Sequence, residues 1–312
     1  MLEVTNLQKH FILNNGRRLR AVNGVSFQVQ RNEALGIVGE SGCGKSTLGR
    51  LILRLIEPSG GQAYFGEVEL TGISRRALRL QRKNMQMVFQ NPFASFNPKI
   101  RIGGALTEVC RYYGMNASES RAKIEHLLND TGLSPDLLSR WPRELSGGQL
   151  QRFAIARSLL SEPSLLIADE PLSALDVSVQ AQLLNLFDYL RASRSMVMIF
   201  ISHDMTVVEY FCDRVAVMYM GRIMELIPAA RLSQALHPYT RSLRASAPRL
   251  DVFKDSSGGN RPAPIHGETP NPQALIKGCA FAPRCPEAKP RCLEDLPELR
   301  EVAAGHWVRC GE

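Results

Sequence analysis

The chain has 312 residues, a length that fits about two domains, and 44% of its residues are hydrophobic, as in ordinary globular proteins. No apolar run reaches the roughly 20 residues that cross a bilayer, and the N-terminus lacks a signal segment, so we expect the chain in the cytoplasm. The net charge of +8 allows anionic partners. The arginines are scattered without interleaved aromatic residues, which disfavours a nucleic-acid surface.

Short apolar or alternating runs predict strands over residues 2–7, 22–30 and 34–38, and together they suggest a sheet at the N-terminus. Two later runs, "LLIA" (165–168) and "VMIFIS" (197–202), are apolar, and each follows a helix-like stretch. This is the pattern of buried parallel strands joined by helical crossovers. The sequence therefore predicts an α/β fold.

Between the early strands and these two runs, residues 90–145 carry few strand signals and a helix-like segment over 118–131, which predicts an inserted helical subdomain at about 90–150. After residue 230, "LHPYTRSLRASAP" is helix-like, and residues 248–272 are rich in Pro, Gly, Ser and Asn. We interpret 248–272 as a linker, flexible at Asp255–Gly259. The predicted domains are 1–230 and a small cysteine-bearing domain at 231–312.

A phosphate-binding loop follows the third predicted strand, because "GESGCGKST" has the spacing G-x-x-x-x-G-K-[ST]. Its glycines let backbone N–H groups turn inward at a helix N-terminus, which holds phosphates by main chain. Lys45 would reach the β- and γ-phosphates, Ser46 would bind Mg²⁺, and Asp169 would supply the acidic group beside the metal. The candidate nucleotide-binding residues of the loop are Gly39, Ser41, Gly42, Gly44, Lys45, Ser46 and Thr47.

A second glycine pair lies in "ELSGGQLQRFAIA". Ser146 followed three residues later by Gln149 is a capping box, so the segment predicts a second helix N-terminus. Gly147 and Gly148 remove side chains from its tip, as the close approach of an anion requires. An ordinary capped helix explains the same residues when they are considered alone.

The motifs have a definite order: the phosphate loop, Gln90 in "MVFQNP", "LSGGQ", "LLIADEP", "SALD", and His203 in "IFISHD". Over about residues 1–230 this set resembles the ATP-binding-cassette ATPases, which are P-loop NTPases that use ATP and Mg²⁺. The resemblance implies that two cassettes pack head to tail. Ser146, Gly147, Gly148 and Gln149 of one cassette would then cap the γ-phosphate bound by the other.

The resemblance also implies roles for single residues. Phe11 would stack on adenine, although an aromatic residue there is as often part of a core. Gln90 would sense Mg²⁺ and the attacking water, which Glu170 would polarise. Asp176 would link the two sites of the dimer, and His203 would contact the γ-phosphate. The implied catalytic set is Glu170, His203 and Gln90.

Two further stretches, "NPFASFNPKIRIG" and "GCAFAPRCPEAKPRC", look like those of ATPase subunits from bacterial dipeptide and oligopeptide ABC importers. That branch implies a second ATPase subunit, two membrane permeases, a solute-binding protein, and a peripheral position on the cytoplasmic membrane face. Residues 90–114 would meet the permease. Similar importers carry nickel or glutathione.

Two alternatives belong to other classes. One is a cassette ATPase acting on nucleic acid or ribosomes, which the absence of a long coiled coil and of a second cassette disfavours. The other is a redox or metal sensor with the ATPase as its output.

Four of the seven cysteines, Cys279, Cys285, Cys292 and Cys310, are grouped near the C-terminus, separated by five, six and seventeen residues. Zinc sites usually have two to four residues between paired ligands, so this spacing argues modestly against zinc. Four thiolates also suit a [4Fe–4S] cluster, which the resemblance to the importer branch implies. Zinc and four unliganded thiols remain alternatives. We expect such a cluster to stabilise the structure of the small domain rather than to transfer electrons.

Overall fold

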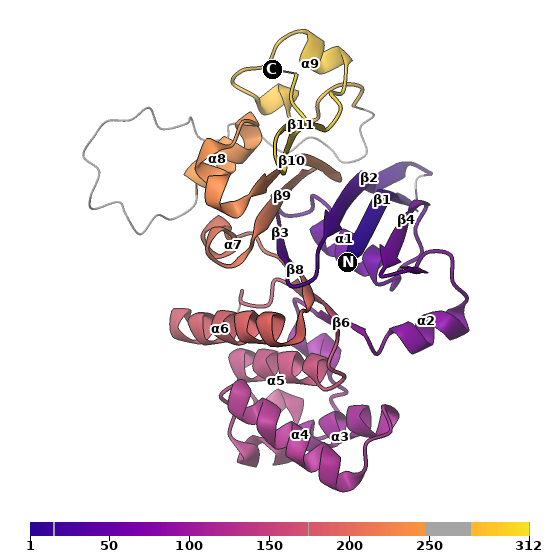
Figure 1. The fold of residues 1–312 in the computed structure, drawn as a ribbon, viewed down its shortest axis with the longest axis vertical. Coiled ribbons are helices and arrows are strands. Elements are labelled where there is room, and N and C mark those ends of the chain that lie inside the picture. Colours follow the sequence, from indigo (N-terminus) through magenta and orange to yellow (C-terminus); the bar gives the residue numbers. More distant parts are fainter. Residues whose placement is uncertain (15, 174, 247–275, 312) are drawn as a thin grey trace, which may run out of the picture. The chain divides into compact units, whose positions relative to one another are not determined.

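A computed structural model describes residues 1–14, 16–173, 175–246 and 276–311 (Figure 1). The chain divides into two compact units. The first unit comprises Met1–Val29, Ala34–Gly72 and Ser202–Glu312, and the second comprises Gln30–Glu33 and Ile73–Ile201. The predicted linker at 248–272, with Asp255–Gly259, lies outside the described residues. The first unit joins the N-terminal strands to the C-terminal region, and the domain division at residue 230 stays a prediction.

The first unit contains an antiparallel sheet of four strands in the order β2-β1-β4-β5 (Figure 1). Alternate residues of the first strand, such as Leu2 and Val4, are buried, which explains why the period of two predicts it. The strands predicted over 2–7 and 22–30 are confirmed, and both are longer than expected. Their bounds are β1 (Leu2–Ile12), β2 (Arg18–Val29), β4 (Gly60–Phe65) and β5 (Val68–Glu69).

The third predicted strand belongs to a different sheet, so the expectation that all three early strands form one sheet is wrong. β3 (Ala34–Val38) is buried along its whole length and pairs in parallel with β9 (Arg214–Tyr219). A strand covered on both faces suits a parallel neighbour rather than a half-exposed antiparallel sheet. Antiparallel strands extend β9 in the order β10 (Arg222–Pro228), β12 (His306–Val308) and β11 (Arg300–Ala303). The C-terminal segment therefore adds two strands to this sheet.

The helices of the first unit are short. α1 buries Leu48, Leu51 and Ile52 completely, and α8 begins at Pro238 after the capping residue His237. The predicted helical character of "LHPYTRSLRASAP" is thus confirmed for the described part. The bounds are α1 (Lys45–Ile52), α7 (Met205–Phe211), η4 (Ala229–Gln234), α8 (Pro238–Ala245), η5 (Ala282–Arg284) and α9 (Arg291–Glu294).

The second unit contains three parallel strands in the order β8-β7-β6. They are β6 (Met85–Val88), β7 (Leu165–Asp169) and β8 (Val197–Ile201), and α6 (Val177–Arg194) connects the last two. Every residue of β7 and β8 is buried, as their continuous apolar sequence predicts.

Between β6 and β7 the described residues form helices and no strand. α3, α4 and α5 contact one another (Figure 1), and the helix predicted over 118–131 is α4. The bounds of the unit's remaining helices are α2 (Arg75–Gln81), η1 (Pro92–Ser95), α3 (Ile102–Tyr112), α4 (Ala117–Asp130), η2 (Pro135–Ser139), η3 (Pro142–Glu144) and α5 (Gly147–Leu159). Within the part of the chain that the structure describes, no helix has the length and apolar character needed to cross a membrane.

Candidate nucleotide-binding site

The loop from Gly39 to Gly44 links β3 to α1, and its backbone requires glycine at both ends. Gly39 has a φ of 152° and Gly44 a φ of 107°. A Cβ atom would lie 2.2 Å from the Met218 carbonyl oxygen at Gly39, and 2.1 Å from the Ala21 carbonyl oxygen at Gly44. Side chains are therefore excluded from these two positions, while the loop leads directly into a helix N-terminus that favours anions.

Lys45, the first residue of α1, turns its side chain back over this loop. Its Nζ atom donates to the carbonyl oxygens of Gly39 at 2.7 Å and Glu40 at 3.0 Å, and the residue is only 6% exposed. The ammonium charge thus lies at the loop that the sequence assigns to phosphates. Ser46 and Thr47 follow in the first turn of α1, and Ser41 and Gly42 are exposed at the tip of the loop.

His203 lies in the turn after residue 201, which is attached to β3. The Ser202 N–H donates to the Ile37 carbonyl at 3.1 Å, and Asp204 caps α7 through the Thr206 N–H at 2.8 Å. The exposed His203 is therefore held beside the strand that precedes the phosphate loop. Its contact with the γ-phosphate stays a prediction.

In the second unit, two residues assigned separately to the attacking water contact each other. Gln90 Nε2 donates to Glu170 Oε2 at 2.8 Å. Asp169 ends β7 and is 1% exposed, whereas Glu170 turns out of the strand with a φ of 47° and donates its N–H to Ile201 at 2.9 Å. The backbone turn at Glu170 therefore leaves the Asp169 side chain buried and the Glu170 side chain half-buried.

The second predicted helix N-terminus is confirmed. Ser146 Oγ accepts from the Gln149 N–H at 3.2 Å, and Gln149 Oε1 accepts from the Ser146 N–H at 3.0 Å. This capping box begins α5, and Ser146 and Gly147 are exposed at its tip. A Cβ atom on Gly147 would meet nothing within 4 Å, so the glycine leaves open space in front of the helix.

Asp176 is the N-cap residue of α6. This structural role is separate from the predicted one, in which Asp176 links the two sites of a dimer. Its carboxylate accepts from the Ser178 hydroxyl at 2.6 Å and the Val179 N–H at 3.0 Å. These two hydrogen bonds lower the pKa of the Asp176 carboxyl below its usual value.

Phe11 lies within β1, opposite Leu19, rather than after the strand. It is 37% exposed, and Lys9 Nζ lies 5.1 Å from its ring centroid. The ring therefore keeps an accessible face, and its contact with adenine stays a prediction.

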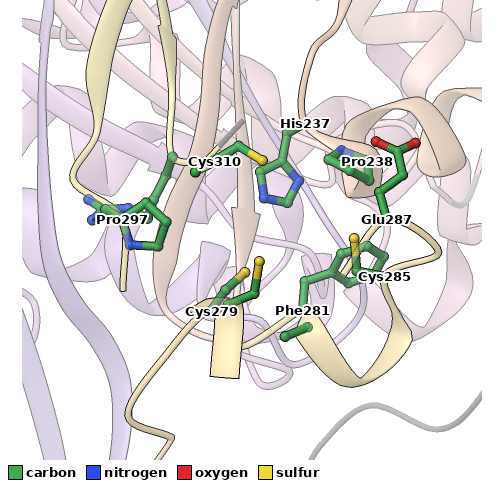
Figure 2. A pocket seen from close by; sticks show the side chains of 12 residues that line it. His237, Pro238, Cys279, Phe281, Cys285, Glu287, Pro297 and Cys310 are labelled. Atoms are coloured by element: carbon green, nitrogen blue, oxygen red, sulfur yellow. Dashed lines mark hydrogen bonds between the residues drawn. The ribbon is translucent and has the colours of Figure 1, made fainter. Parts of the chain in front are cut away.

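The four C-terminal cysteines, separated in sequence, line one pocket of the first unit together with His237, Phe281 and Arg309 (Figure 2). The Cys279 N–H donates to the Cys292 carbonyl at 2.7 Å, which closes the loop between them. Burial raises the pKa of the Cys279 and Cys285 thiols. In the described parts of the chain, no three His, Cys, Asp or Glu side chains converge on a point that could hold a single metal ion.

Sequence reasoning missed one contact of the phosphate loop. Arg284 donates from its two terminal nitrogens to the two carboxylate oxygens of Glu40, at 2.8 and 3.0 Å. Glu40 occupies a position at which the loop pattern accepts any residue, and Arg284 lies 244 positions away. No signal in the sequence connects the two.

The chain resembles known proteins in both its parts. Residues 22–173 match the family described as ABC transporter, and residues 224–292 match the oligopeptide/dipeptide transporter C-terminal region. The oligopeptide transport ATP-binding protein AppF of Bacillus subtilis is 45% identical over 99% of this chain and 96% of its own length. The probable peptide ABC transporter ATP-binding protein y4tS of Sinorhizobium fredii is also 45% identical, over 99% of this chain and 89% of its own.

Solved structures agree with this relation. The dimeric structure of MJ0796, a bacterial ABC transporter cassette, is 25% identical, with a TM-score of 0.69 over 73% of this chain and 99% of its own. The structure of cbiO1 from Clostridium perfringens is 27% identical, with a TM-score of 0.65 over 75% and 90%. Because the sequence matches extend over nearly the whole chain and include the ordered motifs, the chain belongs to the family of ATP-binding proteins of oligopeptide ABC transporters.

Proposed function

We propose that this chain binds and hydrolyses ATP to power the import of dipeptides or oligopeptides through a membrane ABC transporter. The observation that carries the proposal is the loop from Gly39 to Gly44, with the Lys45 ammonium bound to its carbonyl oxygens. The names of the relatives support peptides as the cargo class. A related importer of nickel or glutathione would use the same machinery, because this subunit acts on ATP and not on the cargo.

The proposed residue roles follow the chemistry of phosphoryl transfer. Its transition state is loose, and negative charge spreads over the equatorial phosphate oxygens, so catalysis depends on positioning and on positive charge. Lys45 and the N–H groups of the loop supply that charge, together with His203. Glu170 orients the attacking water with Gln90, whose side-chain amide is already bonded to the Glu170 carboxylate. Phe11 supports the adenine ring.

Mg²⁺ bound with the nucleotide would neutralise charge on the phosphate oxygens. Its proposed protein ligands are Ser46, Gln90 and Asp169. They fit the ion by chemistry, because Mg²⁺ prefers oxygen ligands, and Asp169 offers a buried carboxylate at a strand end.

The proposed assembly contains a second ATP-binding subunit, two permeases and an extracytoplasmic solute-binding protein, on the cytoplasmic face of the inner membrane. The open space before Gly147 supports a partner's nucleotide at Ser146, Gly147, Gly148 and Gln149, with Asp176 linking the two sites. Residues 90–114 would contact the permease. We also keep the division into a cassette (1–230) with a helical subdomain (about 90–150) and a C-terminal domain (231–312) as a proposal.

The four-cysteine pocket is a further part of the proposal. Four thiols and the cationic Arg309 line the same pocket, which fits a group held by several thiolates, each of which carries negative charge. A [4Fe–4S] cluster takes one cysteine per iron, and four cysteines line this pocket, whereas their spacing in the sequence argues modestly against a zinc site. Bound there, the cluster would link the loops that carry Cys279, Cys285, Cys292 and Cys310.

The test of the ATP site is Lys45→Ala. The variant should lose most ATP binding in a titration of the full-length chain, and cells that carry it should lose peptide uptake. Lys83→Ala, which removes an exposed lysine of the second unit, is the matched control and should retain both. Unchanged ATP affinity in the Lys45 variant would refute the proposed site, and normal peptide uptake would refute the proposed transport role.

A further inference from the structure

A cysteine-bearing segment of the C-terminal region contacts the phosphate loop directly. Arg284 directly precedes Cys285, which lines the four-cysteine pocket, and its guanidinium binds the Glu40 carboxylate through both terminal nitrogens, at 2.8 and 3.0 Å. Paired hydrogen bonds of this kind are strong and fix the geometry of both groups. Arg284 of the C-terminal region thus fixes the position of the Glu40 side chain in the phosphate loop.

The surroundings of Arg284 keep this pair in place. Its side chain is 8% exposed, against 23% for Glu40, and it also donates to the Tyr219 hydroxyl at 3.1 Å. The rings of Tyr219, Tyr239 and Phe281 pack together, with centroids 4.7 to 5.5 Å apart. The carboxylate raises the pKa of the Arg284 guanidinium, so the arginine stays charged.

Glu40 is held through its carboxylate, its N–H and its carbonyl oxygen. Its side chain binds Arg284, its N–H donates to the Tyr239 hydroxyl at 2.9 Å, and its carbonyl oxygen accepts from Lys45 Nζ at 3.0 Å. One of these partners is the lysine assigned to the phosphates. The Glu40 carboxylate also places a negative charge in the loop that is proposed to bind the triphosphate of ATP. The carboxylate and the phosphates carry charge of the same sign, so they repel each other.

We propose that Arg284 is a positioning residue of the phosphate loop, which neutralises the Glu40 carboxylate and thereby permits tight binding of the anionic nucleotide. The proposal rests on the assignment of Gly39–Thr47 to ATP. It gives the C-terminal region a direct effect on nucleotide affinity, beyond a role as a separate structural domain.

The test is the ATP affinity of the full-length chain. Arg284→Met should raise the Kd for ATP about tenfold, because it removes the positive charge of the guanidinium and leaves the negative charge of the Glu40 carboxylate in place. In the assembled transporter the KM for ATP should rise, with kcat at saturating ATP nearly unchanged. Adding Glu40→Gln to Arg284→Met should restore most of the affinity, since the repelling charge is then gone.

Arg241→Met is the matched control, because Arg241 on α8 also binds a carboxylate of the tail, that of Glu287, without contacting the loop. It should leave ATP affinity unchanged, and thermal unfolding of all variants shows whether each remains folded. Equal losses in Arg284→Met and the double variant, or in Arg241→Met, would overturn the proposal in favour of a purely structural contact. Loss of binding in Lys45→Ala with none in Arg284→Met would overturn only this inference, whereas intact binding in Lys45→Ala would overturn the ATP site itself.

Discussion

Glu170 combines a strained backbone with a defined hydrogen-bond partner. A residue other than glycine at a φ of 47° costs about 1 kcal/mol or more, and such strain persists only where surrounding contacts impose it. Here the N–H bonds to Ile201, and the side chain accepts from Gln90. In this conformation the Glu170 carboxylate lies within hydrogen-bond distance of Gln90.

We therefore expect Glu170→Gln to fold normally, because the new amide oxygen can still accept from Gln90. Steady-state ATP hydrolysis by the assembled transporter should fall at least about a hundredfold, since the carboxylate proposed to polarise water is lost. ATP binding should stay nearly intact, and the variant should trap the closed dimer. Asp188→Asn, which removes an exposed carboxylate on α6, is the control. Near-normal turnover of the Glu170 variant would show that another group activates the water.

At single residues, the sequence predicted what depends on short-range spacing. The capping box of Ser146 and Gln149 and the glycines of the phosphate loop follow from patterns a few residues long. The pair of Arg284 and Glu40 could not be predicted, because it joins positions 244 residues apart and one of them is unspecified in the loop pattern. Phe11 was expected after a strand and lies inside it, since strand ends are poorly marked by composition.

Among the elements, strand identity was easier to predict than strand neighbours. β3, β7 and β8 are recognisable as buried apolar runs, and all three are buried along their length. An apolar run does not indicate which strand will be its neighbour in the sheet, so β3 was assigned to the wrong sheet. Its partner β9 is about 180 residues away, and pairings over such separations leave no local signal.

α5 offers a test of whether its N-terminus serves a partner's nucleotide. Ser146→Arg should abolish hydrolysis by the assembled transporter without weakening ATP binding to the isolated chain, because bulk and charge would block closure of the dimer. The change also removes the cap of α5, at a cost of about 1 kcal/mol. Asn116→Arg removes the equivalent capping box of α4 and is the matched control, with hydrolysis expected to persist. A large loss of affinity in the isolated Ser146 variant would mean that the loop binds ATP of its own chain.

At the scale of the whole molecule, the C-terminal region is built into the first unit. β12 pairs with β10, Glu225 at 0% exposure accepts from His306 at 2.7 Å, and Arg284 holds Glu40. These contacts join residues 276–311 to both the sheet and the phosphate loop. The sequence predicted a small cysteine-bearing domain there, but not its strands, because two short segments of three and four residues carry little periodic signal.

The four-cysteine pocket sets the final prediction. Protein purified without oxygen should contain about four iron and four acid-labile sulfide atoms per chain, since each of the four thiolates can bind one iron. Cys285→Ser should lose most of the iron and lower the melting temperature, because the proposed cluster would link the loops that carry the four cysteines. Cys110→Ser is the matched control, a buried cysteine of the second unit outside the pocket, and it should keep its iron. Stoichiometric zinc, or protein without metal, would contradict the cluster and leave the proposed ATP site unaffected, because none of the residues proposed to bind phosphate lines this pocket.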